Sequence, residues 1–260
     1  IISRVGDDDF GTLNLRRLQQ DGVDTSGITI APGESTGSAF VRYRADGSRR
    51  FVFNITHSAC GRLEATAASD ALIASCDHLH LMGSALAAPG MRALALHALH
   101  TIKARGGSIS FDPNLRRELL GAPGLHEALQ QTLAATDIFL PSGDELYLFT
   151  TAQNESDAIA ELLARGIKEI LLKRGEQGAS HYSADGRLDA APIAVHEDDP
   201  TGAGDSFGGA YIALRLNGHD AASALRYANA AGARAVTRIG PMEGTSTLAE
   251  LDALLARTGD

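Results

Sequence analysis

Short apolar segments alternate with longer alanine- and leucine-rich segments over much of this sequence. The apolar segments are typical of buried β-strands and stand at 78–83, 108–114, 137–142 and 169–175. The segments between them are typical of helices and stand at about 90–105, 116–135 and 154–166. Repeated strand–helix–strand units predict an α/β fold with three layers, in which helices cover both faces of a mostly parallel central sheet.

The polar residues that directly follow these strands are the first candidates for a binding site. In parallel sheets of this kind, ligands bind at the carboxyl ends of the strands. The residues at those places are Gly83, Ser84, Asp112, Asn114, Arg116, Ser142, Glu145, Lys173 and Gly175. We therefore expect several of them to lie around one site.

The first 60 residues have a different pattern. Residues 1–5 indicate a strand, and a helix should follow, with the acids of residues 7–9 at its positive end. The sequence "GSAFVRYRADGSRRFVFN" then places hairpin turn residues between two β-type runs. Arginines share these runs with aromatic residues, which favours an exposed flap or an interface. Because no repeat or low-complexity linker interrupts the chain, we expect one domain over residues 1–260.

Composition excludes several partners. The 260 residues carry a net charge of −9, with 32 acids against 23 lysines and arginines and no basic block. Nucleic acid and anionic membranes are therefore not expected to bind. The two cysteines, Cys60 and Cys76, lack the spacing of a zinc or redox motif. No run reaches the ~18 apolar residues of a membrane span, and no secretory signal begins the sequence, so we expect a cytoplasmic protein.

The stretch "HEDDPTGAGDSFGGAY", residues 196–211, combines acids with freely rotating glycines. Its G-x-S-x-G match would suit a hydrolase, but that triad needs an acid and then a histidine downstream, and no acid lies between Ser206 and His219. A dinucleotide fingerprint would need glycine where Phe207 stands. A Walker loop would need the dipeptide Gly-Lys, which the sequence does not contain.

An anion-binding helix start remains. Gly202, Ala203 and Gly204 leave backbone N–H groups unobstructed just before the apolar segment 207–216, which indicates a buried helix. Such N–H groups and the helix dipole attract phosphate oxygens. Asp205 beside them has two interpretations: a simple helix-capping residue, or a base that takes a proton from a hydroxyl attacking the phosphate.

Five motifs resemble those of the ribokinase-like (PfkB) carbohydrate kinases and occur in the family's order. They are "VGDDDFG" with "LQQDGVDTSGI", "SFDPNLR", "KRGEQGA", "DDPTGAGDSF" and "YANAAGARAV", and they extend over essentially the whole sequence. The resemblance implies a ribokinase-like fold with a small β-lid inserted at about residues 36–60. It also implies that ATP, with Mg²⁺, supplies a phosphoryl group to a sugar hydroxyl.

The resemblance also implies a role for each matching residue. Asp205 would be the general base, and the anion hole would comprise Gly202, Ala203 and Gly204. The nucleotide would be bordered by Lys173, Gly175, Gly178 and Asn229. The substrate would contact Asn114, Arg116 and His57, although solvation of His57 is an equal alternative. Glu145 would organise Mg²⁺ through water, and Asp199 with Thr201 matches a site where some members bind a monovalent cation, which makes K⁺ a candidate.

Three departures from the family pattern bear on the site, the first on the magnesium–phosphate network and the other two on the substrate. Ser142 stands where the N-x-x-E motif has asparagine. The family's usual first strand, with a sugar-binding aspartate and a Gly-Gly pair, does not precede "IISRVG", so we expect a truncated sequence or an incomplete sugar site. Phe53 and Ile55 replace the Tyr-x-Arg with which 2-keto-3-deoxygluconate kinases hold a carboxylate, and isoleucine cannot form that bidentate contact.

We therefore expect an ATP-dependent kinase acting on a primary hydroxyl of a neutral ketohexose, most like tagatose kinases. Arg116 in "DPNLR" keeps a sugar acid open, so 2-keto-3-deoxygluconate kinase and fructokinase stay as alternatives. A non-catalytic regulator that binds sugar or nucleotide is the alternative of another class. Because the family's lid often forms a dimer interface, a homodimer is expected.

Overall fold

The computed structural model describes residues 1–43, 49–115 and 121–258. The chain divides into two compact units. The first comprises residues 1–108 and 116–132, and the second comprises residues 109–115 and 133–260. Arg116, which is named in the sequence predictions, lies outside the described residues.

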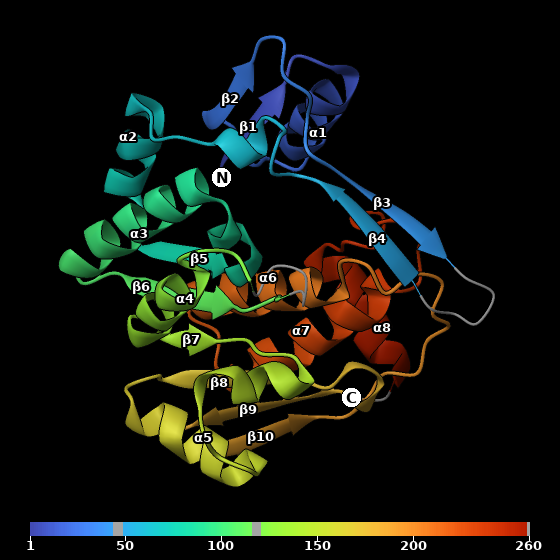
Figure 1. Ribbon diagram of the computed structural model, residues 1–260. Helices are drawn as coiled ribbons and strands as arrows, with labels where there is room; N and C mark the ends of the chain where they lie inside the picture. The colour runs from blue at the N-terminus through green and yellow to red at the C-terminus, as the bar shows by residue number, and fades with distance from the viewer. Residues whose placement is uncertain (44–48, 116–120, 259–260) are drawn as a thin grey trace. The chain divides into compact units, whose positions relative to one another are not determined.

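The first unit contains the N-terminal strands and the hairpin (Figure 1). Its elements are β1 (Ile2–Gly6), α1 (Asp9–Gln20), β2 (Gly27–Ala31), β3 (Ser38–Tyr43), β4 (Arg49–Asn54), α2 (Ala67–Ser75), β5 (His78–Met82) and α3 (Pro89–Ala104). Strand β1 pairs in parallel with β2, and β3 pairs with β4 in the predicted hairpin. Asp8 caps α1 by accepting a hydrogen bond from the Gly11 N–H at 2.8 Å. The boundary between the units falls within α4 (Leu125–Ala134).

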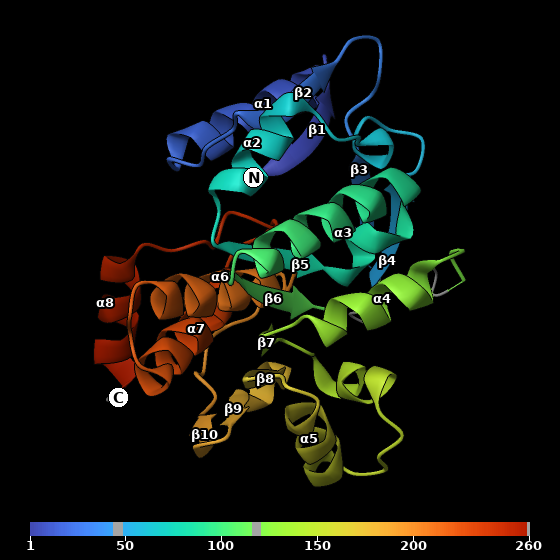
Figure 2. The same ribbon diagram turned by 90° about the vertical axis from the view of Figure 1, so that its left-hand side faces the viewer.

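The second unit is a mixed sheet with helices on both faces. Its strands are β6 (Ser108–Asp112), β7 (Ile138–Phe139), β8 (Glu169–Lys173), β9 (Ala179–Ser183) and β10 (Gly186–Ala190), in the order β10-β9-β8-β7-β6. Helix α5 (Glu155–Ala164) covers one face, and the other carries α6 (Ala203–Leu216) and α7 (Ala221–Ala235), with α8 (Leu248–Thr258) packed against α7 (Figure 2). Strands β6, β7 and β8 are parallel, whereas β9 and β10 are antiparallel. Only five residues join β8 to β9, too few for the crossover that a parallel pair needs.

The core of the second unit lies between β8 and α6. Leu171 of β8 packs in one cluster with Phe207 and Tyr211 of α6, and all three are buried. On the other face, Phe111 stacks on Phe139 and both meet Phe149 edge-to-face, with ring centroids 5.7–5.9 Å apart. Strand β8 is therefore covered on both sides, which agrees with its almost continuous apolar sequence.

The predicted α/β organisation is confirmed, with two local differences. Helix α6 begins at Ala203 and not at Phe207, because Gly202 adopts a left-handed conformation (φ +85°) that starts the helix there. Strand β7 has only two residues, although the apolar segment was expected to span 137–142. In the three described ranges, no helix is both long and apolar enough to span a membrane.

Candidate active site

The turn before helix α6 is held by a buried aspartate. Asp199 is 2% exposed, and its Oδ1 accepts hydrogen bonds from the Thr201 N–H and hydroxyl at 3.0 and 2.7 Å. Its Oδ2 accepts from the Gly240 N–H at 3.0 Å. One carboxylate thus ties two segments of the chain together, 41 residues apart. The backbone of the glycine turn is fixed by these bonds.

Gly202 is the residue that this turn requires. A side chain at Gly202 would place its Cβ 2.2 Å from the Pro241 carbonyl oxygen, well inside contact distance. Its positive φ also favours glycine. Helix α6 begins at the next residue, and its first turn, in which the Ala203 N–H donates to the Pro200 carbonyl oxygen at 3.4 Å, follows the glycine turn directly. Asp205 is exposed in that first turn.

Two side chains from the ends of parallel strands meet beside the helix start. Lys173 at the end of β8 forms an ion pair and hydrogen bond with Asp112 at the end of β6. The side chains are 11% and 4% exposed. A Cβ added to Gly204 would lie 3.6 Å from Lys173 Nζ, so the ammonium lies against the first turn of α6. The sequence indicated both ends as candidate sites but did not pair these two residues.

Glu145 lies in the short helix Gly143–Phe149 and binds backbone with both carboxylate oxygens. It accepts from the Ser142 N–H at 2.8 Å and from the Leu115 N–H at 2.9 Å. Burial raises the pKa of Glu145, and the charge of nearby Asp112 adds to this, while the two N–H groups and Lys173 oppose it. Glu145 thus joins the loops that follow β6 and β7.

An ion pair between side chains holds the turn between β8 and β9. Arg174 forms two hydrogen bonds, of 2.8 and 2.7 Å, with the Glu155 carboxylate. The contact with Arg174 lowers the pKa of Glu155 to about 2, although burial opposes it, and a hydrogen bond from Tyr182 contributes. Gly178 closes the turn with φ +83°, and a Cβ there would lie 2.2 Å from the Ala190 oxygen. Neither Arg174 nor Glu155 is among the site residues predicted from the sequence.

A cavity of about 450 Å³ brings together most of the residues expected around a nucleotide. The site residues predicted from sequence that line it are Lys173, Gly175, Gly178, Ala203, Gly204 and Asn229. Ile193, Val195 and Phe207 supply apolar lining. The Asn229 side-chain amide donates to the Ala191 carbonyl oxygen at 2.7 Å, so it also fixes the cavity wall. The cavity thus combines the glycine-rich start of α6 with apolar side chains and with the charged side chains of Lys173, Glu176 and Glu197.

The residues expected around the substrate are placed less completely. Asn114 follows Asp112, adopts a left-handed backbone (φ +36°) and donates its N–H to Asp112 Oδ1 at 3.1 Å. His57 is exposed in the first unit, after β4. Arg116 lies outside the described residues. The substrate roles of these three residues stay predictions.

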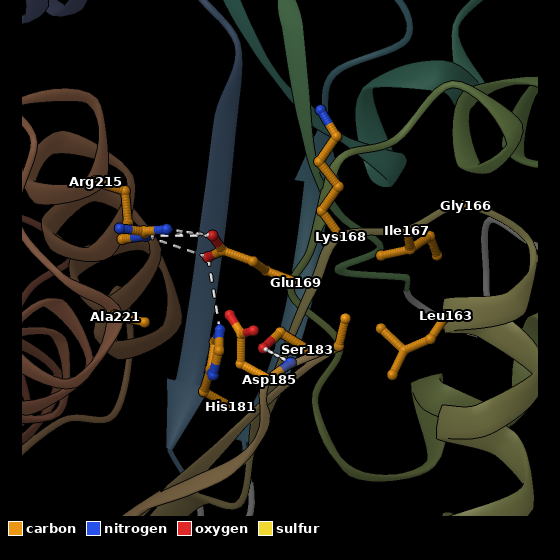
Figure 3. A pocket seen from close by; sticks show the side chains of 11 residues that line it. Leu163, Gly166, Ile167, Lys168, Glu169, His181, Ser183, Asp185, Arg215 and Ala221 are labelled. Carbon is orange, nitrogen blue, oxygen red and sulfur yellow. Dashed lines mark hydrogen bonds and ion pairs between the residues drawn. The ribbon is translucent and has the colours of Figure 1, made fainter.

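A second cavity, of about 440 Å³, lies at the opposite end of β8 (Figure 3). Among its lining residues are Glu169, His181 and Arg215. Glu169 accepts from Arg215 Nη2 at 2.6 Å and from the Tyr211 hydroxyl. His181 is 3% exposed, and neither ring nitrogen has a hydrogen-bond partner among the residues that the structure describes; its Nε2 lies 3.7 Å from Glu169 Oε2. Sequence patterns gave no signal for this cluster.

Comparisons with known proteins agree with these features. The family model described as pfkB family carbohydrate kinase matches residues 1–248. Fructokinase-1 of Zea mays is 32% identical over 267 residues, which cover 98% of this chain and 82% of that protein. The 2-dehydro-3-deoxygluconokinase of Thermoproteus tenax is 31% identical, with coverages of 98% and 79%. An E. coli crystal structure with ATP and Mg²⁺, provisionally described as a ribokinase II, has a TM-score of 0.94 and 50% identity, with coverages of 99% and 82%.

Proposed function

Because the chain belongs to the pfkB family of carbohydrate kinases, we propose that it transfers the γ-phosphoryl group of ATP to a primary hydroxyl of a ketohexose such as tagatose. The expected family, the ribokinase-like fold and the carbohydrate-kinase class are confirmed. The observation that carries the proposed chemistry is the start of α6. Gly202 places the first turn of this helix beside the cavity, with Asp205 in that turn.

The reaction assigned to this site is a direct transfer. Asp205 accepts the proton of the attacking sugar hydroxyl, whose oxygen forms a bond to the γ-phosphorus. The bond from that phosphorus to the β–γ bridging oxygen breaks, and its electron pair leaves with ADP. The N–H groups at residues 202–204 stabilise the charge on the phosphoryl oxygens, as helix starts do for anions. The positive end of the helix also favours the ionised form of Asp205.

The 450 Å³ cavity suits the nucleotide. Its apolar lining around Ile193 and Val195 fits a base, and the helix start at Gly204 fits the phosphates. The relative from E. coli contains ATP and Mg²⁺, which supports the same cofactors here. Arg174 and Glu155 act indirectly, by bracing the turn that forms one wall.

The donor set fits a magnesium ion that arrives with the nucleotide. Among the described residues, no group of three or more His, Cys, Asp or Glu side chains could hold a metal ion. Mg²⁺ in kinases is commonly held by one or two carboxylates together with phosphates and water. Glu145 would hold it through water, and the ion would offset the charge of the phosphates. Ser142 contributes its backbone N–H to Glu145, so the substitution of the family's asparagine leaves this carboxylate oriented.

The role of Asp199 and Thr201 as ligands for K⁺ stays a proposal. In the structure, Asp199 organises the glycine turn through Thr201 and Gly240. A carboxylate has about four lone-pair sites, so these bonds are compatible with a bound cation. Turnover in potassium chloride against tetramethylammonium chloride tests the proposal, and equal rates would remove it.

Asp205→Asn tests the kinase mechanism. The variant should bind ATP nearly as well as the wild type but lose on the order of 10²–10⁴-fold in kcat, the usual contribution of a general base. Formation of the sugar phosphate and of ADP would be followed with saturating sugar. Near-normal turnover by the variant would refute the role of Asp205. A wild type that binds ATP and sugar without turnover would favour the non-catalytic regulator.

The identity of the sugar is tested by a panel of tagatose, fructose and 2-keto-3-deoxygluconate. Relatives named for fructose and for the sugar acid both lie near 30% identity, which supports these two candidates, whereas tagatose rests on the sequence resemblance alone. Ile55→Arg should shift kcat/KM toward the sugar acid by about tenfold, because a guanidinium pairs with a carboxylate. Ile55→Leu is the matched control. No shift in preference would show that Ile55 does not face the substrate.

We also propose a homodimer through the β3–β4 hairpin. Phe40 and Val52 stand opposite each other on one face, and they are 66% and 59% exposed. Covering such apolar side chains is a common reason for association. The molecular mass in solution tests this, and a monomer at assay concentrations would contradict it.

A further inference from the structure

The ion pair between Lys173 and Asp112 is deeply buried, and a contribution to stability alone does not account for it. Both side chains are largely shielded from water, at 11% and 4% exposed. Burying two charges costs desolvation energy that their attraction often only offsets, so an apolar pair would commonly serve stability as well. The pair therefore invites a functional explanation, and its position suggests one.

The lysine lies where a phosphoryl group would approach. Its ammonium is within 3.6 Å of the place where a Gly204 side chain would begin, and both residues line the 450 Å³ cavity. An ammonium has three N–H donors, and the hydrogen bond to Asp112 uses one. Donors thus remain for phosphate oxygens at the helix start.

Asp112 is itself fixed. Its Oδ1 accepts from the Asn114 N–H at 3.1 Å, while its Oδ2 contacts Lys173. Asn114 adopts a left-handed backbone (φ +36°) at the residue whose N–H binds the aspartate. Asp112 is therefore a rigid acceptor that sets the direction of a flexible lysine side chain.

We propose that Lys173 contacts the terminal phosphoryl group of ATP, and that Asp112 is a positioning residue that holds the ammonium against the first turn of α6. This inference rests on the proposed kinase function and goes beyond a lysine that merely borders the nucleotide. Lys173 offsets the charge of the group being transferred, whereas Asp112 acts only through Lys173.

The first test measures binding and needs no turnover. The double variant Lys173→Met with Asp112→Asn removes both charges and leaves no buried ion alone. Isothermal titration calorimetry with β,γ-imido-ATP and with ADP, both with Mg²⁺, compares it with the wild type. Affinity for β,γ-imido-ATP should fall about 10- to 100-fold, as expected for losing a charge-assisted contact, while affinity for ADP should change less than about threefold. Equal losses for both ligands, or no loss, would overturn the proposal.

Lys168→Met is the matched control. Lys168 pairs with buried Asp137 at the other end of the same strand, at 2.9 Å, and its side chain is 73% exposed. The variant Lys168→Met should leave the affinities for β,γ-imido-ATP and for ADP unchanged. A selective loss of β,γ-imido-ATP affinity in this control would mean that remote charge, and not contact, explains the effect, and would overturn the proposal.

The positioning role is tested by a double-mutant cycle on kcat. Asp112→Asn should lower kcat about tenfold with little change in KM for the sugar, because the lysine is present but misdirected. Added to Lys173→Met, the change Asp112→Asn should lower kcat almost no further, since Asp112 acts through the lysine. Lys173→Arg keeps the charge, so its kcat should lie between those of Lys173→Met and the wild type. Additive losses, or no rescue by arginine, would refute the positioning role.

The outcomes separate this inference from the kinase proposal. If the wild type phosphorylates no sugar but the double variant selectively loses β,γ-imido-ATP affinity, the kinase function fails while the phosphate contact stands. If the wild type is an active kinase and the double variant binds both ligands as before, only the inference fails.

Discussion

Strand β8 and helix α6 meet at two places that are built differently. At the carboxyl end of the strand, Lys173 lies against Gly204 in the first turn of the helix. At the amino end, Glu169 accepts hydrogen bonds from Tyr211 and Arg215 near the end of the helix. Because the same two elements form both contacts, the difference between them reflects local chemistry and not topology.

The Glu169 end is saturated. Burial alone would raise the pKa of Glu169. Contacts with His181, Arg215 and Tyr211 outweigh burial and lower this pKa to about 2. Burial and the neighbouring Glu169 raise the pKa of Tyr211. The Lys173 end keeps N–H donors directed at a cavity. One end is thus suited to holding the helix on the strand, and the other to binding an anion.

The largest effect should come from Gly202→Ala, which disrupts the start of helix α6 at the Lys173 end. The added Cβ would meet the Pro241 oxygen, and φ +85° strains any side chain. We expect kcat/KM for ATP to fall on the order of a hundredfold, because small displacements of a phosphate site are costly. The free energy of unfolding should fall by about 2–3 kcal/mol. Steady-state kinetics and urea unfolding measure both.

Gly209→Ala in the same helix is the control for that variant. A Cβ at Gly209 meets nothing within 4 Å, so alanine should stabilise the helix by about 0.5–1 kcal/mol and leave activity unchanged. Similar losses of activity in both variants would show that α6 tolerates no change, and the contrast between its ends would fail.

Glu169→Gln should have the next largest effect, on stability alone. The variant leaves Arg215 without its charged partner, so the free energy of unfolding should fall by about 2–3 kcal/mol at pH 7. At a temperature where the variant is folded, kcat should stay within about threefold of the wild type. A large loss of kcat would mean that the saturated end also positions the reacting groups.

The pH dependence sharpens this prediction. The pKa of Glu169 is depressed from its ordinary value of 4.5, so its contribution is present above pH 4.5 and is lost as the pH falls toward 2. Between pH 5 and pH 2, the wild type should lose about 2 kcal/mol more stability than Glu169→Gln, since the carboxylate is partly solvated. Parallel losses in urea unfolding would contradict the assignment.

The smallest effect is expected for His181→Phe. The buried imidazole has no hydrogen-bond partner in the described part of the chain, so replacing it removes unpaired polar atoms. The adjacent 440 Å³ cavity can accept a larger ring. The melting temperature should stay constant or rise, and the free energy of unfolding should change by less than about 1 kcal/mol. A loss above about 2 kcal/mol would show that the contact of His181 with Glu169 outweighs the cost of burying the imidazole nitrogens.

Local sequence predicted the parts of the site that depend on neighbouring residues. Residues 202–205 carry the turn and the helix start within four positions, so this local structure could be predicted without the fold, while their roles in the reaction stay predictions. Lys173 and Asn229 line the predicted nucleotide cavity, although their roles there stay predictions. The single-domain expectation over residues 1–260 also stays a prediction, beside the division into two compact units.

The sequence by itself thus determined the alternating strands and helices, the glycine turn and the family. Only the tertiary structure decided which charges meet. Asp112 and Lys173 are 61 residues apart, and Glu169 and Arg215 are 46 apart. Hydrophobic periodicity specifies which face of an element is buried, but not which side chains from distant elements share a pocket. That choice follows from strand order and from packing between the layers, where burial makes each charge depend on its partner.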